Sequence, residues 1–169
     1  MSASSAANSM ESKPALPPVV KEIVVALPPR AAFDLFTAQV AQWWPMAQYS
    51  CFQADCRRIE FEPRAGGAVT EVASDGRTAP WGTIVVWDPP HRFSMTWHPS
   101  FDPAQATFLE VAFAPAAAGG SSVRLMHSGW EARGEKAAGM REGYDGGWVG
   151  VLQRFADRAA AVANGGVAP

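Results

Sequence analysis

The hydrophobic pattern of the first third of the chain predicts one strand followed by a short helix. Residues 19–27 (VVKEIVVAL) are rich in β-branched side chains, which favour a strand, and the second of the two prolines that follow suits a first helical turn. Apolar side chains then recur at three- and four-residue steps, at Phe33, Phe36, Val40 and Trp43. This spacing places them on one face of a short helix or helix pair that ends at Pro45. Residues 46–56 show no period and are predicted to form a loop.

From residue 57 onward the period changes to two, which is typical of half-buried strands. The alternation predicts six further strands, at residues 57–62, 68–73, 81–87, 92–98, 106–114 and 121–128. Turn residues separate them, among them Gly66, Gly67 and Asp75-Gly76, and the glycines supply the positive φ that a tight return needs. Because no helix interrupts these strands, we expect an antiparallel meander.

Past Gly129 the pattern becomes helical again. An apolar stripe repeats at three- and four-residue steps and comprises Met140, Tyr144, Trp148, Leu152, Phe155 and Ala159. The first half of this helix carries glycines at positions 139, 143, 146, 147 and 150. Each glycine inside a helix costs about 1 kcal/mol relative to Ala, so tertiary packing must supply the order that propensity does not.

These elements predict an α+β fold in which the long C-terminal helix covers the apolar face of a curved seven-stranded antiparallel sheet. A strongly twisted sheet wrapped around one helix leaves gaps, and glycines on the helix enlarge such a gap into a cavity. The expected lining is Phe93, Met95 and Trp97 from one strand and Val123, Leu125 and His127 from another. A mainly apolar pocket with a few polar groups is the usual form of a small-molecule site.

The 169 residues are about the length of one domain, which we place at residues 18–163. Residues 1–17 are rich in Ser, Ala and Pro without the pattern of a signal peptide and are predicted to be a disordered tail. Residues 164–169 are expected to fray. Cys51 and Cys56, five positions apart, match neither a zinc motif nor a disulfide framework, so a reducing cytoplasm is the expected location.

The formal net charge of −2 gives no basic excess for a phosphate backbone, so nucleic acid is not an expected partner. No apolar run is long enough for a membrane span. His91 and His98 are expected to be solvated, and the three histidines lack metal-ligand spacing, so neither a metal nor another cofactor is predicted. Nucleophile elbows and phosphate-binding loops are also absent from the sequence. The sequence leaves the oligomeric state open, a homodimer included.

Four segments carry a resemblance to a known family: AQWWP (41–45), FEPRAGGAVTEV (61–72), PWGTIVVWDPPHRFSMTWH (80–98) and MREGYDGGWVGVLQRFA (140–156). Over residues 19–160 the chain resembles the bacterial relatives of the activator of heat-shock-protein-90 ATPase. That family lies in the START-like, or SRPBCC, superfamily. The resemblance implies a helix-grip fold and ligand binding in a deep hydrophobic cavity, but superfamily membership does not fix the function. It also implies contact with a chaperone as a further possibility.

Three residues are weak candidates for acid–base chemistry. Glu71 is buried if Val69 faces the core, and Arg92, Tyr144 or His127 would then be its partner; the opposite register places it in water. His127 shares a strand face with Leu125 and is either a hydrogen-bonded core residue or a polar group that meets a ligand. Tyr144 lies in the middle of the helical stripe, where a core role and a catalytic role are both open.

The predicted ligand-binding set combines these groups with large apolar side chains: Trp44, Glu71, Trp81, Phe93, Met95, Trp97, His127, Tyr144 and Trp148. The leading hypothesis is a non-catalytic domain that binds a small hydrophobic or aromatic molecule. A cyclase- or hydratase-type enzyme using Glu71, His127 and Tyr144 is the first alternative. A co-chaperone-like interaction module is the second.

Overall fold

The computed structural model describes residues 15–165, and the predicted outer parts of both tails, residues 1–14 and 166–169, lie outside the described residues. The chain begins with strand β1 (Val19–Val25), followed by helix α1 (Pro29–Phe36). Pro29 stands in the first turn of α1, as the sequence predicts, and a 3-10 turn over Val40–Gln42 continues the apolar face. Ahead of β1 the main chain is fixed to the last helix, because Arg141 donates hydrogen bonds to the carbonyls of Pro17 and Pro18.

The segment predicted as a loop, residues 46–56, contains helical turns, and this prediction was wrong. It forms helix α2 (Met46–Tyr49) and a 3-10 turn over Gln53–Asp55. Neither turn buries a residue, and each is too short to repeat an apolar period, so periodicity carried no signal of them.

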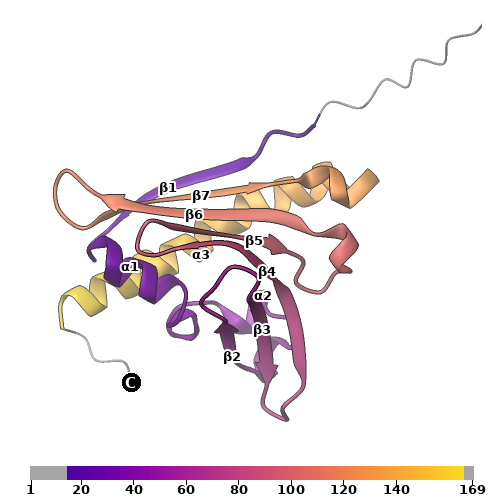
Figure 1. Cartoon of the computed structure of the whole chain (residues 1–169), viewed down its shortest axis with the longest axis horizontal. Helices are drawn as coiled ribbons and strands as arrows, with labels where there is room; N and C mark the ends of the chain where they lie inside the picture. The colour runs from indigo at the N-terminus through magenta and orange to yellow at the C-terminus, as the bar shows by residue number, and fades with distance from the viewer. Residues whose placement is uncertain (1–14, 166–169) are drawn as a thin grey trace, which may run out of the picture.

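In the described part of the chain, seven antiparallel strands form one curled sheet in the order β1-β7-β6-β5-β4-β3-β2 (Figure 1). The six strands after β1 are β2 (Cys56–Phe61), β3 (Ala68–Ala73), β4 (Thr78–Asp88), β5 (Arg92–Trp97), β6 (Thr107–Pro115) and β7 (Ser121–Ser128). This is the predicted meander, closed on one side by β1 against β7. Strand β4 starts earlier than predicted because its first residues pair with β3 and its last residues with β5.

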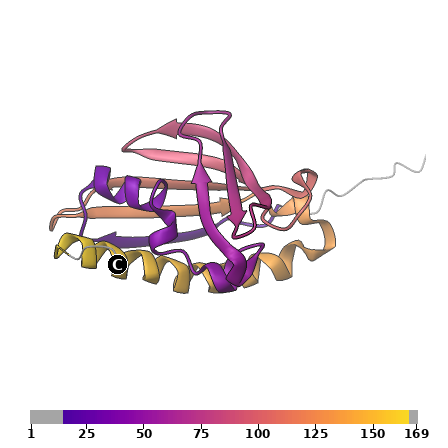
Figure 2. The same ribbon diagram turned by 90° about the horizontal axis from the view of Figure 1, so that it is seen from below.

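Gly82 lies where β4 passes from one partner strand to the other. A Cβ at this position would lie 1.8 Å from the carbonyl oxygen of Thr96 on β5, so no other residue fits without moving the backbone. Register shifts on both sides of Gly82 accompany this close approach. The sheet can therefore curl here, and it carries β2 and β3 away from the plane of the other strands (Figures 1 and 2).

Helix α3 (Ala137–Ala163) lies along one face of the sheet, as Figure 2 shows. The chain reaches it from β7 through Gly129, at a positive φ of 78°, and a 3-10 segment over Trp130–Lys136. The predicted stripe of α3 faces the sheet: Trp148, Leu152, Phe155 and Ala159 are buried, whereas Met140 and Tyr144 are half-buried. This arrangement is the predicted helix-grip fold.

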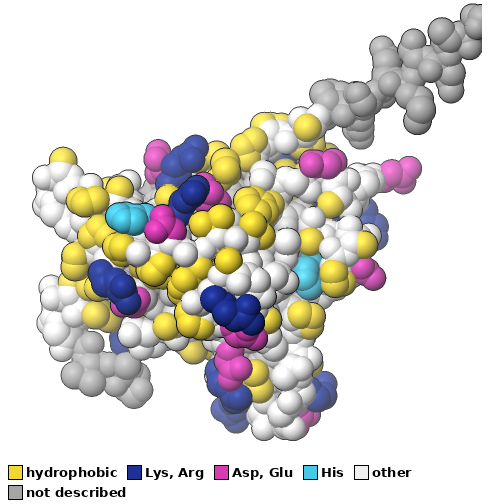
Figure 3. Space-filling model, viewed as in Figure 1, with side chains coloured by type: hydrophobic (Ala, Val, Ile, Leu, Met, Phe, Trp, Pro, Cys, Tyr) yellow, Lys and Arg dark blue, Asp and Glu magenta, His cyan; other side chains and the backbone are white. Residues whose placement is uncertain are grey.

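The surface carries charges of both signs. On the face shown in Figure 3, Lys and Arg side chains stand beside Asp and Glu side chains, with apolar atoms between them. Arg92 and Glu110, for example, form an ion pair of 3.5 Å across β5 and β6. This face therefore presents no continuous basic surface of the kind that binds a phosphate backbone.

Candidate functional site

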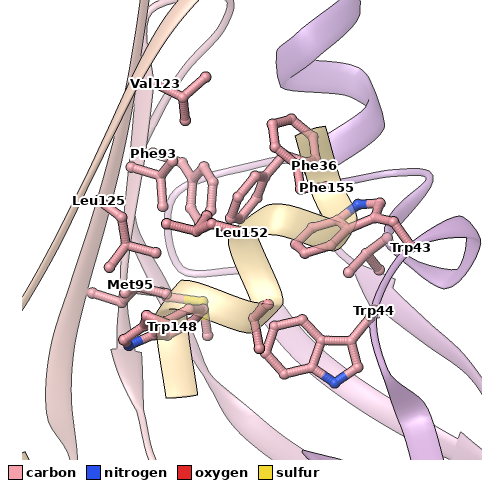
Figure 4. Packing of buried hydrophobic residues seen from close by; sticks show 14 of the residues in the cluster. Phe36, Trp43, Trp44, Phe93, Met95, Val123, Leu125, Trp148, Leu152 and Phe155 are labelled. Carbon is pink, nitrogen blue, oxygen red and sulfur yellow. The ribbon is translucent and has the colours of Figure 1, made fainter. Parts of the chain in front are cut away.

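The central space between the sheet and α3 is filled by the protein's own side chains (Figure 4). Phe93 and Met95 on β5 and Val123 and Leu125 on β7 are fully buried there. Phe36 packs on Phe93 with ring centroids 5.8 Å apart and on Phe155 with 5.0 Å. The sequence predicted that these four strand residues line the cavity. They form closed core instead, because α1 inserts aromatic rings between the sheet and the helix.

A cavity of about 380 Å³ lies nearer the amino-terminal half of α3. Its walls come from α3, from α2 and the residues beside it, and from β5 with the loop that follows. The lining residues are Trp44, Gln48, Tyr49, Ser50, Trp97, Pro99, Ser100, Phe101, Met140, Gly143, Tyr144, Gly147, Trp148 and Val151. At Gly143 and Gly147 the helix contributes no side chain, so the cavity reaches the helix backbone.

Tryptophan rings form one wall of this cavity. Trp97 lies 5.6 Å from Trp148 and 6.1 Å from Trp44, measured between ring centroids, and the rings are tilted rather than stacked. Trp81 supports them from behind, at 4.9 Å from Trp44 and 5.2 Å from Trp97. Such a wall offers ring faces and edges to an aromatic guest.

Glu71 supports the wall without reaching the cavity. It is fully buried on β3, which settles the register in favour of the inward position. Its carboxylate accepts three hydrogen bonds: from the main-chain N–H of Cys51 at 2.8 Å, from that of Phe52 at 2.7 Å and from Trp81 Nε1 at 2.8 Å. The predicted partners Arg92, Tyr144 and His127 are not used. Glu71 thus anchors the segment of residues 50–52 to the sheet, and this segment places Ser50 in the cavity wall.

His127 lies directly behind the cavity and is fully buried. Its Nδ1 accepts a hydrogen bond from Trp148 Nε1 at 3.1 Å, and its Nε2 bonds to Thr107 Oγ1 at 2.7 Å. Burial, with a smaller contribution from the charge of Arg133, lowers the pKa of His127 to about 3. The imidazole is therefore neutral at physiological pH, and both ring nitrogens are already engaged within the protein.

Tyr144 is the predicted acid–base candidate that lines the cavity. Its hydroxyl oxygen accepts a hydrogen bond from Trp97 Nε1 at 3.1 Å, which leaves its own proton free to be donated. Burial raises the pKa of this hydroxyl. The group therefore stays protonated at neutral pH and can act as a hydrogen-bond donor to a guest.

Two further lining residues carry buried polar atoms that have no partner among the described residues. These atoms are Trp44 Nε1 and Ser50 Oγ, in side chains that are 7% and 9% exposed. Ser50 follows α2, the segment that the sequence did not identify as helical, and no motif marks it. A buried donor without a partner is costly, and both atoms are closed off from the surface of the cavity.

The structure therefore divides the predicted ligand-binding set by depth. The residues that line the cavity are Trp44, Trp97, Tyr144 and Trp148. Those that form the layer behind it are Glu71, Trp81 and His127. Phe93 and Met95 belong to the closed core. His98, predicted to be solvated, is buried, whereas His91 is exposed.

The cysteines lie near the cavity but are not activated. Cys51 and Cys56 are both free thiols, and burial is the main cause that raises the pKa of each. Within residues 15–165 no three His, Cys, Asp or Glu side chains are placed to hold a metal ion. None of the helices in that same range combines the length and apolarity required to cross a membrane.

The curled sheet, the long helix and a cavity between them define a START-like protein of the helix-grip type. The family model for "Activator of Hsp90 ATPase homolog 1-like protein" matches residues 26–159, and the chain belongs to this family. A search of the curated proteins finds no match.

Solved structures show the same fold. An anthrahydroquino-γ-pyrone synthase, Txn09, is 35% identical, with a TM-score of 0.60, 85% of this chain and 97% of that chain being covered. A protein from Mesorhizobium loti is 19% identical with a TM-score of 0.61, covering 83% and 94% of the two chains. One from Bacillus halodurans has the same identity and TM-score, covering 85% and 96%. The last two comparisons concern the fold alone.

Proposed function

We propose that this protein binds a small, planar, mainly apolar aromatic molecule in the cavity beside α3. The observation that carries the proposal is the cavity itself, which is about 380 Å³ in volume and walled by Trp44, Trp97 and Trp148. Its size lies in the range of small-molecule sites. The bare helix backbone at Gly143 and Gly147 adds space beside these rings, which suits a fused-ring guest.

The polar groups of the cavity favour a guest that carries carbonyl oxygens. The Tyr144 hydroxyl has a free proton, and Trp44 Nε1 is a donor that has no partner among residues 15–165. Indole N–H can only donate, and the hydroxyl of Ser50 can donate as well. A carbonyl oxygen would accept the Tyr144 proton, whereas a pure hydrocarbon would leave it unpaired. Trp44 Nε1 and Ser50 Oγ are closed off from the cavity, and a small shift of their side chains would bring them to the same oxygen.

The relationship to Txn09 supports the same class of guest. The name of that protein specifies a product in which an anthrahydroquinone is joined to a γ-pyrone, and these are oxygenated fused rings. Its 35% identity spans 85% of this chain. A related protein whose name specifies oxygenated rings therefore supports the same class of guest for this chain.

Calorimetric titration with 2-acetonaphthone and 2-methylnaphthalene tests the proposal. Both are naphthalenes of similar shape, but only the ketone carries an acceptor oxygen. We expect both to bind and to change tryptophan emission, with the ketone bound about fivefold to tenfold more tightly for one additional hydrogen bond. Absence of binding by either compound would refute the proposal.

A ring-closing enzyme is the second candidate function, favoured by the relationship to Txn09 and by the free proton of Tyr144. Of the predicted acid–base groups, Tyr144 alone lines the cavity; Glu71 and His127 are engaged behind it. Tyr144 would polarise a carbonyl as a hydrogen-bond donor. The test is the closure of 1-(2-hydroxyphenyl)-1,3-butanedione to 2-methylchromone with loss of water. A rate equal to that in buffer would leave binding as the function.

Cytoplasmic location, a homodimeric state and contact with a chaperone stay predictions. The family description names a chaperone activator, but none of the features described for residues 15–165 identifies a chaperone-binding surface.

A further inference from the structure

Arg133 is a buried cation without a counter-ion in the described part of the chain. It lies in the 3-10 segment before α3, and its side chain is only 5% exposed. Its Nε and Nη1 atoms have no hydrogen-bond partner among the described residues. Its Nη2 makes one long contact, 3.4 Å, with the carbonyl oxygen of Trp97. A buried charge that is neither paired nor fully hydrogen-bonded is strongly unfavourable, which marks this position as unusual.

Two titratable groups that face Arg133 are neutral. Tyr144 on α3 and His127 on β7 are close enough to interact with its charge, but the first is a protonated phenol and the second a neutral imidazole. No Asp or Glu of residues 15–165 forms an ion pair with it. The guanidinium keeps its charge at neutral pH even though burial lowers its pKa.

Phe101 separates Arg133 from the cavity. The central carbon of the guanidinium lies 3.8 Å from the centroid of the Phe101 ring, a cation–π contact, and the same ring lines the cavity. Phe101 is 38% exposed and follows Ser100, whose φ of 65° is in the left-handed region. The ring therefore stands on a solvent-facing loop, outside the closed core, and its displacement would open the free N–H groups of Arg133 to the cavity.

We propose that Arg133 binds an anionic oxygen group of the ligand, a carboxylate or an enolate, which reaches the guanidinium when the Phe101 ring moves aside. This inference rests on the proposed function, since it concerns the ligand of the same cavity. Nε and Nη1 lie on different edges of the guanidinium, so a carboxylate would pair with one of these free groups and with Nη2, whose contact to the Trp97 carbonyl is long. Two-pronged pairing of this kind is the one for which Arg is best suited. The ligand is then an aromatic anion rather than a neutral ring system.

The test compares 2-naphthoate with 2-naphthamide, which has nearly the same shape but no charge, by calorimetry. We expect wild-type protein to bind the carboxylate at least about tenfold more tightly, the effect of hydrogen bonds to a charged group. Since the formal net charge is −2, overall attraction cannot produce this preference. In Arg133→Met the preference should vanish while 2-naphthamide binding stays. The matched control is Arg154→Met, which removes an equal charge from the exposed side of α3. This variant should keep the preference for the carboxylate.

Replacement of Arg133 by Met should not unfold the protein, because an apolar side chain of similar length suits a buried position without a counter-ion. If it does, Arg133→Gln serves the same comparison, since it also removes the charge and keeps polar N–H groups at this position. Equal affinity for the two naphthalenes in wild-type protein would overturn the inference, as would a preference that survives in both Arg133 variants. Binding of 2-acetonaphthone in the same series would show that the proposed function itself still stands.

Phe101→Ala tests the covering ring. Removal of the ring takes apolar contact from both probes, but it also removes the barrier in front of Arg133. We therefore expect the ratio of carboxylate to amide affinity to rise above that of wild-type protein. A ratio that falls would contradict the role given to Phe101.

Discussion

The indole N–H of Trp148 donates to Nδ1 of His127, and this contact fixes the proton of the imidazole on Nε2. Because indole can only donate, Nδ1 must carry a lone pair. The Nε2–H then points to Thr107 Oγ1, whose hydroxyl donates to the carbonyl of Trp97. The neutral form of His127 thus holds the Trp148 ring in the cavity wall. Protonation of His127 at Nδ1 would break this hydrogen bond.

His127 should make the stability of the protein fall below neutral pH. Its pKa is about 3 in the folded protein and 6.5, the ordinary value of a histidine, in the unfolded chain. Between these values the unfolded chain binds the proton and the folded protein does not, so stability is retained above pH 6.5 and lost as the pH falls toward 3. We expect this one group to add about 1.4 kcal/mol per pH unit to the slope of the unfolding free energy.

Urea unfolding of wild type and His127→Gln at pH 7, 6, 5 and 4 measures this slope. The difference between the two proteins should shrink as the pH falls, because only the wild type loses the contribution of His127. His91→Gln is the matched control, since His91 is exposed, and its curve should run parallel to that of wild type. Parallel curves for His127→Gln would contradict the prediction.

Glu71→Gln should loosen the cavity wall formed by residues 50–52. The carboxylate receives three N–H donors, and an amide group replaces one accepting oxygen by a donor that faces them. At least one buried N–H then lacks an acceptor, and we expect a loss of about 2–3 kcal/mol in the free energy of unfolding. Hydrogen exchange at the main-chain N–H groups of Cys51 and Phe52 should accelerate, and 2-acetonaphthone binding should weaken.

The exposed pair Glu62–Arg64 provides the control for Glu71. Its carboxylate and guanidinium lie 3.0 Å apart at the surface, where such a pair contributes little. Glu62→Gln should therefore change stability by less than about 0.5 kcal/mol. If both Gln variants behave alike, Glu71 does not anchor the wall.

Gly147→Leu should block the cavity without weakening the fold. A Cβ at this position meets only the Tyr49 hydroxyl, at 3.9 Å, so the longer side chain fits by extending into the space where a guest would lie. Gly146→Leu is the matched variant, because its Cβ meets nothing and Gly146 does not line the cavity. Both should raise the melting temperature, since Leu exceeds Gly in helix propensity by somewhat under 1 kcal/mol. Only Gly147→Leu should reduce 2-acetonaphthone affinity, by at least about tenfold.

Tyr144→Phe should reduce discrimination between ketone and hydrocarbon. It removes the donor proton for the guest, and also the acceptor for Trp97 Nε1. Affinity for 2-acetonaphthone should fall about fivefold to tenfold, while 2-methylnaphthalene affinity changes little. Tyr49→Phe, which removes a hydroxyl from a half-exposed side chain of the same cavity, is the comparison. An equal fall for both ligands would indicate a purely structural role.

Periodicity predicted much of the framework because the elements that form it are long. The meander and the stripe of α3 each repeat their apolar period several times, so the sequence pattern indicated which faces are buried. Helix α2 makes a single turn and buries nothing, so it left no such trace. The core position of Phe93 depends on how far α1 inserts Phe36, a distance between elements that no local pattern encodes.

The polar side of the site was harder to predict than the apolar side. Trp44, Trp97 and Trp148 attracted notice as large rings, but Ser50 is an ordinary residue beside a turn. Arg133 lies in the charged segment EARGEK, whose composition is that of a solvated surface. Its burial under Phe101 results from a loop that joins β5 to β6, more than thirty positions earlier in the chain. The opposite strand faces left open for Glu71 also required a three-dimensional register to decide.

Because Glu71 binds main-chain N–H groups, the residues that determine ligand specificity can differ from those that stabilise this wall of the cavity. Since the carboxylate holds Cys51 and Phe52 by their backbone, the side chains at Gln48, Tyr49 and Ser50 can be exchanged without loss of that anchor. Relatives could therefore diverge in what they accept by altering these positions while keeping an identical frame. A designer could vary the same three sites to re-target the domain.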